Sequence, residues 1–338
     1  CANEKLTSMP FDSKLLTNLL DPPILFFVLG VFTALIKSNL EVPSQVGKFL
    51  SLYLLMALGF KGGVALNHSG LNSAMMFALL GAFLMSALVP LYSFGVLRFR
   101  RIPPYDAAAI AATYGSVSAV TFIAASSMLE RAGCAVGGHM AVALVIMESP
   151  AIFMAVLFAT FVRSRDPNRA ADRVTLGMGK VFHEAFTDGA HLLLLGSLVI
   201  GAITGEAGKK TMSPFLGDIF KGILTFFLLE MGILVGRRFR ELKTVGPFLV
   251  AFALVMPLVN ATVATVLAKL FGLVLGDAVL LAVLAASASY IVVPAVVRFA
   301  IPEANPSLYF SMALGVTFPF NLTIGLPLYF KVLRWLWE

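Results

Sequence analysis

The sequence predicts an all-α polytopic membrane protein in which ten transmembrane helices form two five-helix units of opposite orientation. Apolar residues make up 59% of the 338 residues and charged residues 13%, whereas a soluble domain is about half apolar and about a quarter charged. Apolar runs long enough to cross a bilayer recur along the whole chain. Two of these runs are interrupted in the middle by small and hydroxyl residues. Paired interruptions of this kind are typical of secondary transporters.

The expected spans follow one another with short loops. They lie at 22–38, 45–66, 72–97, 105–130, 137–162, 188–205, 212–236, 244–272, 276–300 and 306–334. The net charge of +7 does not indicate nucleic-acid binding, because the charges fall on loops between spans. More of the 25 Lys and Arg lie in loops on one side of the expected membrane than on the other, and the richer side includes Arg100, Arg173 and Arg238. The positive-inside rule makes that side cytoplasmic, so both termini are expected outside the inner (plasma) membrane.

The two interrupted runs indicate an internal duplication. They align at an offset of about 170 residues, which is a sequence pointer to the binding site of a transporter. We therefore expect a first unit at 1–162, a cytoplasmic linker at 163–187 and a second unit at 188–338, with a candidate interfacial helix at 179–193. Because each unit has an odd number of spans, the second enters the membrane from the opposite side. The residues paired by the alignment are Asp106 with Asp277, Ser116 with Ser287, Ser118 with Ser289, Gly59 with Gly232, Gly63 with Gly236, and Pro150 with Pro319.

Two helices broken and crossing at the midplane would expose peptide groups of both polarities. A break leaves N–H groups free on one fragment and C=O groups free on the other. Lipid cannot satisfy these groups, so the breaks must face protein or a water-filled cavity. An anion can accept from the N–H ends, while a cation takes carbonyl and hydroxyl oxygens nearby.

The residues around the breaks are the candidate ligands. Hydroxyls can donate to an anion and can offer oxygen to Na+. They can also serve only to join closely packed helices, and the Tyr290 side chain can donate its phenol or fill the cavity. The candidates for the substrate are Gly115, Ser116, Ser118, Ala119, Ser287, Ser289 and Tyr290, and those for Na+ are Ser118, Thr121, Glu148 and Ser289.

Several charged residues lie within or beside the spans, and five of them differ in their expected roles. Glu148 is an ionisable group at membrane depth, which is a functional hypothesis by default. Glu230 lies similarly in the seventh span and could instead pair with a neighbouring helix. Lys61 is expected to extend its ammonium to the membrane surface. Asp106 and Asp277 open their helices and are expected to interact with the helix dipole.

Catalysis is not supported by any motif. The four histidines are scattered without a HExxH motif, and the two cysteines, Cys1 and Cys134, lack metal-binding spacing. No phosphate-binding loop or dinucleotide fingerprint is present. We therefore expect neither an enzyme nor a cofactor, apart from Na+ as coupling ion.

At these residues the chain resembles the sodium-dependent bicarbonate transporter family of bacteria and cyanobacteria. The similarity covers essentially all ten expected spans. Its most specific parts are GFKGGVAL at 59–66, YDAAAIAATYGSVSAVTFIAASSMLE at 105–130, MESPAI at 147–152, RFRELK at 238–243 and RFAIPEANPS at 298–307. The resemblance implies a ten-helix inverted repeat split into a core domain, which carries both broken helices, and a gate domain. It also implies a homotrimer, elevator-type movement, Na+-driven bicarbonate uptake and, in cyanobacterial relatives, a PII-like regulatory protein.

The second break departs from the pattern of this family. The family places an aspartate and further hydroxyls where this chain has Ala288, Tyr290 and Val292. Glu148 stands where the family has an aspartate. Transport of another small anion, such as a short carboxylate, therefore stays open, as does an uncoupled channel or sensor in which Tyr290 plugs the site.

Overall fold

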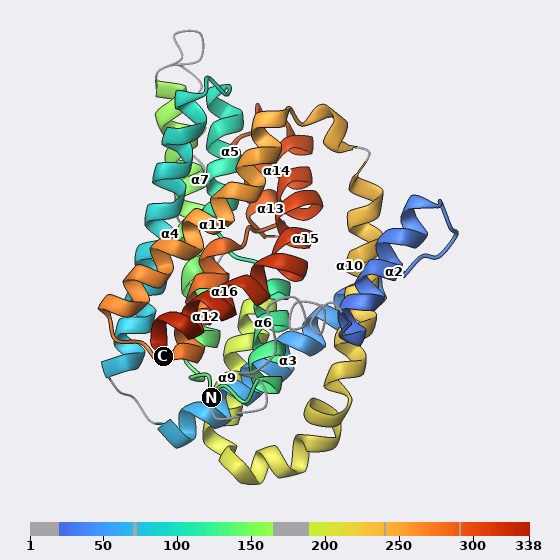
Figure 1. The fold of residues 1–338 in the computed structure, drawn as a ribbon, viewed down its shortest axis with the longest axis vertical. Coiled ribbons are helices and arrows are strands. Elements are labelled where there is room, and N and C mark those ends of the chain that lie inside the picture. The colour runs from blue at the N-terminus through green and yellow to red at the C-terminus, as the bar shows by residue number, and fades with distance from the viewer. Residues whose placement is uncertain (1–19, 70–72, 165–188, 240, 291) are drawn as a thin grey trace.

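The fold is an all-helical bundle (Figure 1), as seen in a computed structural model. It describes residues 20–69, 73–164, 189–239, 241–290 and 292–338. By length and apolar composition, seven helical stretches in these ranges could cross a membrane. They are Ser44–His68, Ser73–Phe99, Pro104–Arg131, Met140–Ser164, Gly189–Arg238, Pro247–Leu270 and Pro306–Trp337. The chain is thus a polytopic membrane protein, as expected.

Each expected span contains helix, although several helices are shorter than a full crossing. The α-helices of the first half are α2 (Pro22–Leu35), α3 (Ser44–Ser69), α4 (Ser73–Phe99), α5 (Pro104–Gly115), α6 (Ala119–Arg131) and α7 (Met140–Ser164). Those of the second half are α9 (Gly189–Met212), α10 (Phe220–Arg238), α11 (Pro247–Leu270), α12 (Leu275–Ala286), α13 (Val292–Ala300), α14 (Pro306–Met312), α15 (Phe318–Phe320) and α16 (Leu326–Trp337). Short π or 3₁₀ turns are η2 (Ser213–Asp218), η3 (Glu241–Thr244), η4 (Ala313–Thr317) and η5 (Asn321–Gly325).

The sixth expected span ends where the backbone bends sharply. Gly205 has φ +55°, a left-handed conformation that glycine adopts without steric cost. Helix α9 resumes beyond this residue with Glu206, Lys209 and Lys210, which are too polar for a bilayer core. Helix α10 therefore begins at Phe220, later than the 212 expected from hydropathy.

Both predicted interruptions are present. Helix α5 ends at Gly115, and α6 begins at Ala119 after an extended segment in which Ser116 has φ −101° and ψ −179°. Helix α12 ends at Ala286, and helix resumes with α13 at Val292. The chain thus crosses these two regions as half-length helices joined by non-helical backbone.

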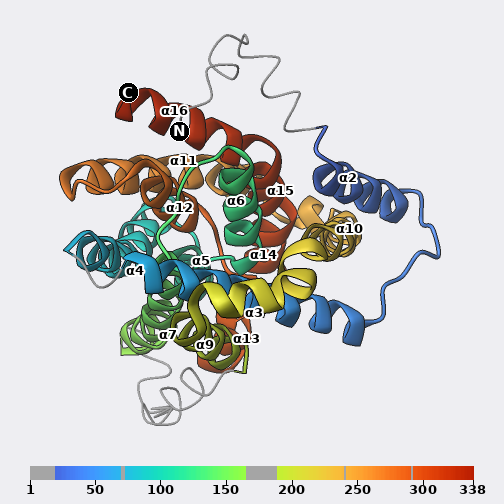
Figure 2. The same cartoon turned by 90° about the horizontal axis from the view of Figure 1, so that it is seen from below.

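Two helix pairs are packed with their backbones in close contact. Helix α2 lies along α10, and α3 lies along α9 (Figures 1 and 2). In the first pair a Cβ atom added to Gly232 would lie 2.1 Å from the Phe27 carbonyl oxygen. In the second, a Cβ atom added to Gly201 would lie 2.2 Å from the Phe60 carbonyl oxygen. Small residues allow this approach, and van der Waals contact then holds the helices together.

The remaining long helices form a second group. Helices α4, α5, α7, α11 and α12 pack on one another, and α6, α13 and the α14–α16 segment complete the group. Seen from below, the α2–α10 pair lies at one side of this bundle, and the α3–α9 pair runs across it (Figure 2). Of the expected linker at 163–187, residues from 165 onward lie outside the described part of the chain, as does most of the candidate interfacial helix.

The glycine contacts predict a position-specific loss of stability on α10. Changing Gly232 to Ala should lower stability by about 2 kcal/mol, because overpacking a close contact forces the backbones apart. The matched control is Gly222→Ala on the same helix, where a Cβ atom meets nothing within 4 Å. This control should be neutral or stabilising, because alanine favours helix over glycine. Thermal unfolding in detergent distinguishes them, and equal midpoints for both variants would contradict the packing.

Candidate functional site

Hydrogen bonds from peptide N–H groups join the two breaks. The Ser118 backbone N–H, in the first break, donates to Ser287 Oγ in the second at 2.9 Å. In return, the Ser289 backbone N–H donates to the carbonyl of Thr113, near the end of α5, at 3.0 Å. The second break thus provides an acceptor for the Ser118 N–H of the first break and a donor for the Thr113 carbonyl of α5. Ser118, Ser287 and Ser289 are all buried.

Most serine hydroxyls at the breaks are already used within the protein. Ser118 caps α6 by accepting from the Thr121 N–H at 3.2 Å, which is the usual role of serine at a helix start. Ser287 Oγ also donates to the Leu284 carbonyl at 2.7 Å. Ser289 Oγ accepts from the Val293 N–H at 3.3 Å, at the start of α13. These three residues therefore hold the breaks in shape.

Two hydroxyls at the first break have no hydrogen-bond partner. Ser116 Oγ and Thr121 Oγ1 are both buried and unpaired. A buried hydroxyl without a partner costs about 1–3 kcal/mol, so two such groups on either side of one helix start are unusual. They are the groups in the predicted set with unused hydrogen-bonding capacity.

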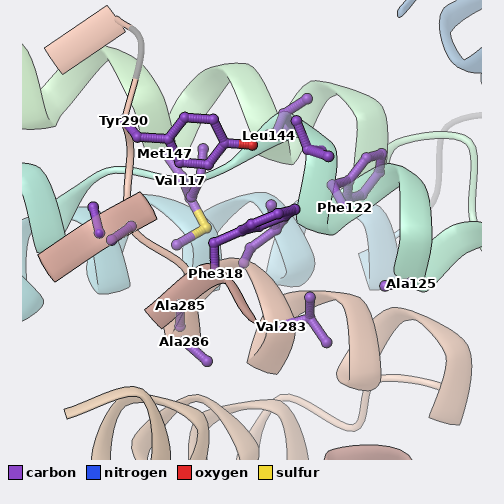
Figure 3. Close-up of a cluster of buried hydrophobic side chains, with 14 of the residues drawn as sticks. Val117, Phe122, Ala125, Leu144, Met147, Val283, Ala285, Ala286, Tyr290 and Phe318 are labelled. Atoms are coloured by element: carbon purple, nitrogen blue, oxygen red, sulfur yellow. The ribbon is translucent and has the colours of Figure 1, made fainter. Parts of the chain in front are cut away.

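Aromatic and apolar side chains fill the space around the breaks. The Tyr290 hydroxyl lies 3.4 Å from Ser118 Oγ, and the Tyr290 ring packs edge-on against Phe318 with centroids 5.5 Å apart. Val117 and Met147 belong to the same cluster (Figure 3). Tyr290 is thus both a hydrogen-bond partner of the first break and part of its apolar cover.

Gly115 and Ala119 flank the first break without offering a side-chain ligand. A Cβ atom on Gly115 would lie 2.3 Å from Cγ of Pro90, inside α4. Gly115 is therefore required for packing against the α4 proline. Ala119 is half-buried at the first turn of α6 and contributes backbone only.

A buried asparagine supports the second break, and the sequence analysis did not single it out. Asn321 Nδ2 donates to the carbonyl of Ala286, the last residue of α12, at 2.8 Å. Asn321 Oδ1 accepts from the Tyr329 hydroxyl at 2.9 Å. An amide within an otherwise apolar span usually bonds across helices, and that signal at 321 could have identified it.

Among the described residues, Glu148 pairs with His191 rather than with the hydroxyls at the breaks. The Glu148 carboxylate on α7 contacts the imidazole of His191 on α9, and both side chains are buried. Glu230, the other intramembrane acid, lies against Gly47 of α3, and its Oε2 has no hydrogen-bond partner. Among the described residues there is no group of three or more His, Cys, Asp or Glu side chains that could hold a metal ion.

The two helix-opening aspartates bind loops of the opposite half. Asp106 and Asp277 both lie in the first turn of their helices, as expected. Asp106 accepts from the Asn305 backbone N–H at 2.8 Å, and Asp277 accepts from the Gly137 N–H at 2.7 Å. Asp277 also lies 3.1 Å from His139 Nε2. These acids tie loops to helix starts outside the breaks.

Lys61 forms an ion pair and a cation–π contact. Its ammonium lies 3.4 Å from Glu130 of α6 and 4.5 Å from the ring centre of Phe220. The expected snorkelling lysine thus joins α3 to α6 by an ion pair.

An all-helical membrane protein with two broken helices that meet through small and hydroxyl residues has the architecture of a secondary transporter. A family model described as the Na+-dependent bicarbonate transporter superfamily matches residues 22–334. The chain belongs to this superfamily of membrane transporters, which confirms the resemblance seen in the sequence. A comparison with curated proteins found no match.

The hydrogen bonds at the breaks predict different stability effects for neighbouring serines. Ser287→Ala removes an acceptor and leaves the Ser118 N–H buried without a partner, which should cost about 1–3 kcal/mol. Ser116→Ala is the matched control, because its hydroxyl has no partner to lose. Chemical denaturation in mild detergent measures both free energies of unfolding. A Ser116→Ala loss as large as that of Ser287→Ala would contradict the assigned hydrogen bonds.

Proposed function

We propose that this protein takes up bicarbonate together with Na+ by secondary active transport, with the solute site at the two helix breaks. The observation that carries the proposal is the direct contact between the breaks, beside the unpaired hydroxyls of Ser116 and Thr121. Membership of the Na+-dependent bicarbonate transporter superfamily supports the choice of substrate and coupling ion.

Helix ends at the breaks offer groups suited to both ions. Helix α6 starts at Ala119, and its first N–H groups carry partial positive charge. A bicarbonate oxygen there can accept from peptide N–H groups and from the Ser116 and Thr121 hydroxyls. Na+ would take oxygens of the same region, for which Ser118, Thr121 and Ser289 are the candidates. Glu148 remains a candidate only if its pair with His191 opens.

The two halves are proposed to be inverted repeats. The close glycine contacts of the α2–α10 pair correspond to those of the α3–α9 pair. Asp106 binds the loop before α14, and Asp277 binds the loop before α7, so each half secures the other in an equivalent way. Such reciprocal contacts are what a two-fold relation between the halves requires.

Transport is proposed to move the helix group that holds the breaks against the two packed pairs. In this account α2, α3, α9 and α10 form a fixed gate domain, and the other helices form the moving core. Two ion pairs join the groups at the end of α6: Lys61 with Glu130 at 3.4 Å and Asp21 with Arg131 at 2.8 Å. Partly exposed pairs of this kind contribute about 0–1 kcal/mol each, so they can break during a transport cycle. A homotrimer, as in relatives, would fix the gate domain.

A second candidate function is a substrate-sensing receptor or channel without coupling. The observation that favours it is the packing of Tyr290 and Phe318 over the breaks. Binding of bicarbonate without flux in reconstituted vesicles would support this candidate over transport. Uptake of a short carboxylate instead of bicarbonate would keep the mechanism and change the substrate.

Removing the unpaired hydroxyls should impair transport more than stability. We expect Ser116→Ala combined with Thr121→Val to reduce Na+-dependent uptake of labelled bicarbonate into proteoliposomes about tenfold or more, which corresponds to about 1.4 kcal/mol of lost interaction. The control is Thr265→Val on α11, where a buried hydroxyl bonds only to its own helix. Unchanged uptake in the double variant would remove these hydroxyls from the site.

The sequence of the second break predicts the coupling ratio. With no acid at that break, we expect one Na+ per bicarbonate, so that no net charge moves. A tenfold Na+ gradient then supplies about 1.4 kcal/mol and concentrates bicarbonate about tenfold. A second Na+ would add about 2.3 kcal/mol per 100 mV of membrane potential. Paired labelled-Na+ and labelled-bicarbonate fluxes measure the ratio. A ratio near 2, with uptake driven by voltage, would contradict the expectation.

A further inference from the structure

A large cavity lies between the two groups of helices. Its volume is about 810 Å³, enough for roughly 25 water molecules at about 30 Å³ each. One wall consists of residues from α3, the end of α9, η2 and the start of α10, and the other of residues from α6, the following loop and the start of α7. The cavity therefore follows the boundary at which the proposed core and gate domains meet.

Cavity-lining residues at and after the end of α6 lie on the face of the molecule that holds the start of α2 and the end of α16. Asp21, before α2, is paired with Arg131 at the end of α6, beside the cavity wall. On the same face, Trp337 near the end of α16 donates its indole N–H to the carbonyl of Leu273, in the loop before α12. The loop that follows α6 lies there too, since Gly137 lines the cavity and binds Asp277 at the start of α12.

One face of α6 leads from this cavity to the first break. Phe122, Ser126 and Glu130 line the cavity and are spaced four residues apart, so they follow one another along a single helix face. Ser118 lies one turn deeper on the same face, at the break itself. Exposure rises outward along this face, from 2% at Phe122 to half-buried Ser126 and exposed Glu130.

Phe122 is the residue between the water-accessible part of this face and the break. It lines the cavity, yet it also belongs to the apolar cluster around Tyr290, Phe318 and Val117 (Figure 3). Toward the mouth, the walls carry charges of both signs, including Lys61, Lys221 and Glu130. Charged walls of this kind favour hydration, whereas Phe122 is 2% exposed and is the cavity-lining residue of α6 nearest the break.

We propose that this cavity is the entrance through which the solute reaches the breaks from the face that holds the start of α2 and the end of α16. In this proposal, Phe122 closes the inner end of the cavity. The inference rests on the proposed function, because it assigns the access route to the site placed at the breaks. It adds a specific side chain as the barrier. Displacement of the Phe122 ring opens the path along α6 from Ser126 to Ser118.

Cysteine modification tests the route without measuring transport. In a background with Cys1 and Cys134 changed to serine, single cysteines replace Ser126, Ile123 or Ser118. The purified protein is treated with a charged methanethiosulfonate reagent and analysed by mass spectrometry. We expect Ser126→Cys to react at least about tenfold faster than Ile123→Cys, because thiol reactivity requires water access. Ile123 is the matched control, since it adjoins Phe122, is 1% exposed and does not line the cavity.

Changing the barrier tests the role of Phe122. Adding Phe122→Ala should raise the rate of modification of Ser118→Cys about tenfold or more, while the rate at Ile123→Cys stays unchanged. Phe122→Leu, a milder change, should give a smaller increase and guards against misfolding of the alanine variant. Equal rates at Ser126→Cys and Ile123→Cys would overturn the entrance. A rate at Ser118→Cys that neither substitution raises would overturn the barrier.

The outcome separates this inference from the proposed function. If the protein shows Na+-dependent bicarbonate uptake but not the expected modification rates, the entrance route is wrong and the proposed function stands. The expected pattern in a protein that shows no uptake would support the route and count against coupled transport.

Discussion

Breaking two helices inside a bilayer frees peptide N–H and C=O groups that lipid cannot satisfy, and the whole structure depends on how they are satisfied. Here each break provides hydrogen-bond partners for the other. Ser287 Oγ accepts from the Ser118 N–H, and the Ser289 N–H donates to the Thr113 carbonyl. Asn321 Nδ2 donates to the carbonyl of Ala286, the last residue of α12. The protein therefore supplies partners for several peptide groups of the breaks, while the hydroxyls of Ser116 and Thr121 have none.

This constraint also explains the packing around the breaks. A polar crossing in the membrane must be shielded from lipid, and the long helices of the second group surround it. The two outer pairs, α2–α10 and α3–α9, are joined tightly by glycines such as Gly232 and Gly201. These pairs contact the second group through ion pairs at the end of α6, and a large cavity lies beside that contact. Tight packing within the groups, with a cavity and partly exposed ion pairs between them, suits relative movement.

Much of this could be predicted from the sequence because local chemistry decides it. Apolar runs located the helices, and small and hydroxyl residues located both breaks. Partners distant in the chain left no periodic signal. The Asn321 contact with Ala286 and the pairing of Glu148 with His191 join residues on separate helices, so only the folded arrangement reveals them. For the same reason, the sequence did not separate hydroxyls that shape the breaks from those left unpaired.

The most direct test is a cryo-EM map of the protein in lipid nanodiscs with Na+ and bicarbonate, compared with a map without them. We expect density for an anion at the start of α6, within hydrogen-bond distance of Ser116 and Thr121, that is absent from the second map. Continuous helix through 116–118 or 287–290, or anion density only at a place remote from both breaks, would contradict it.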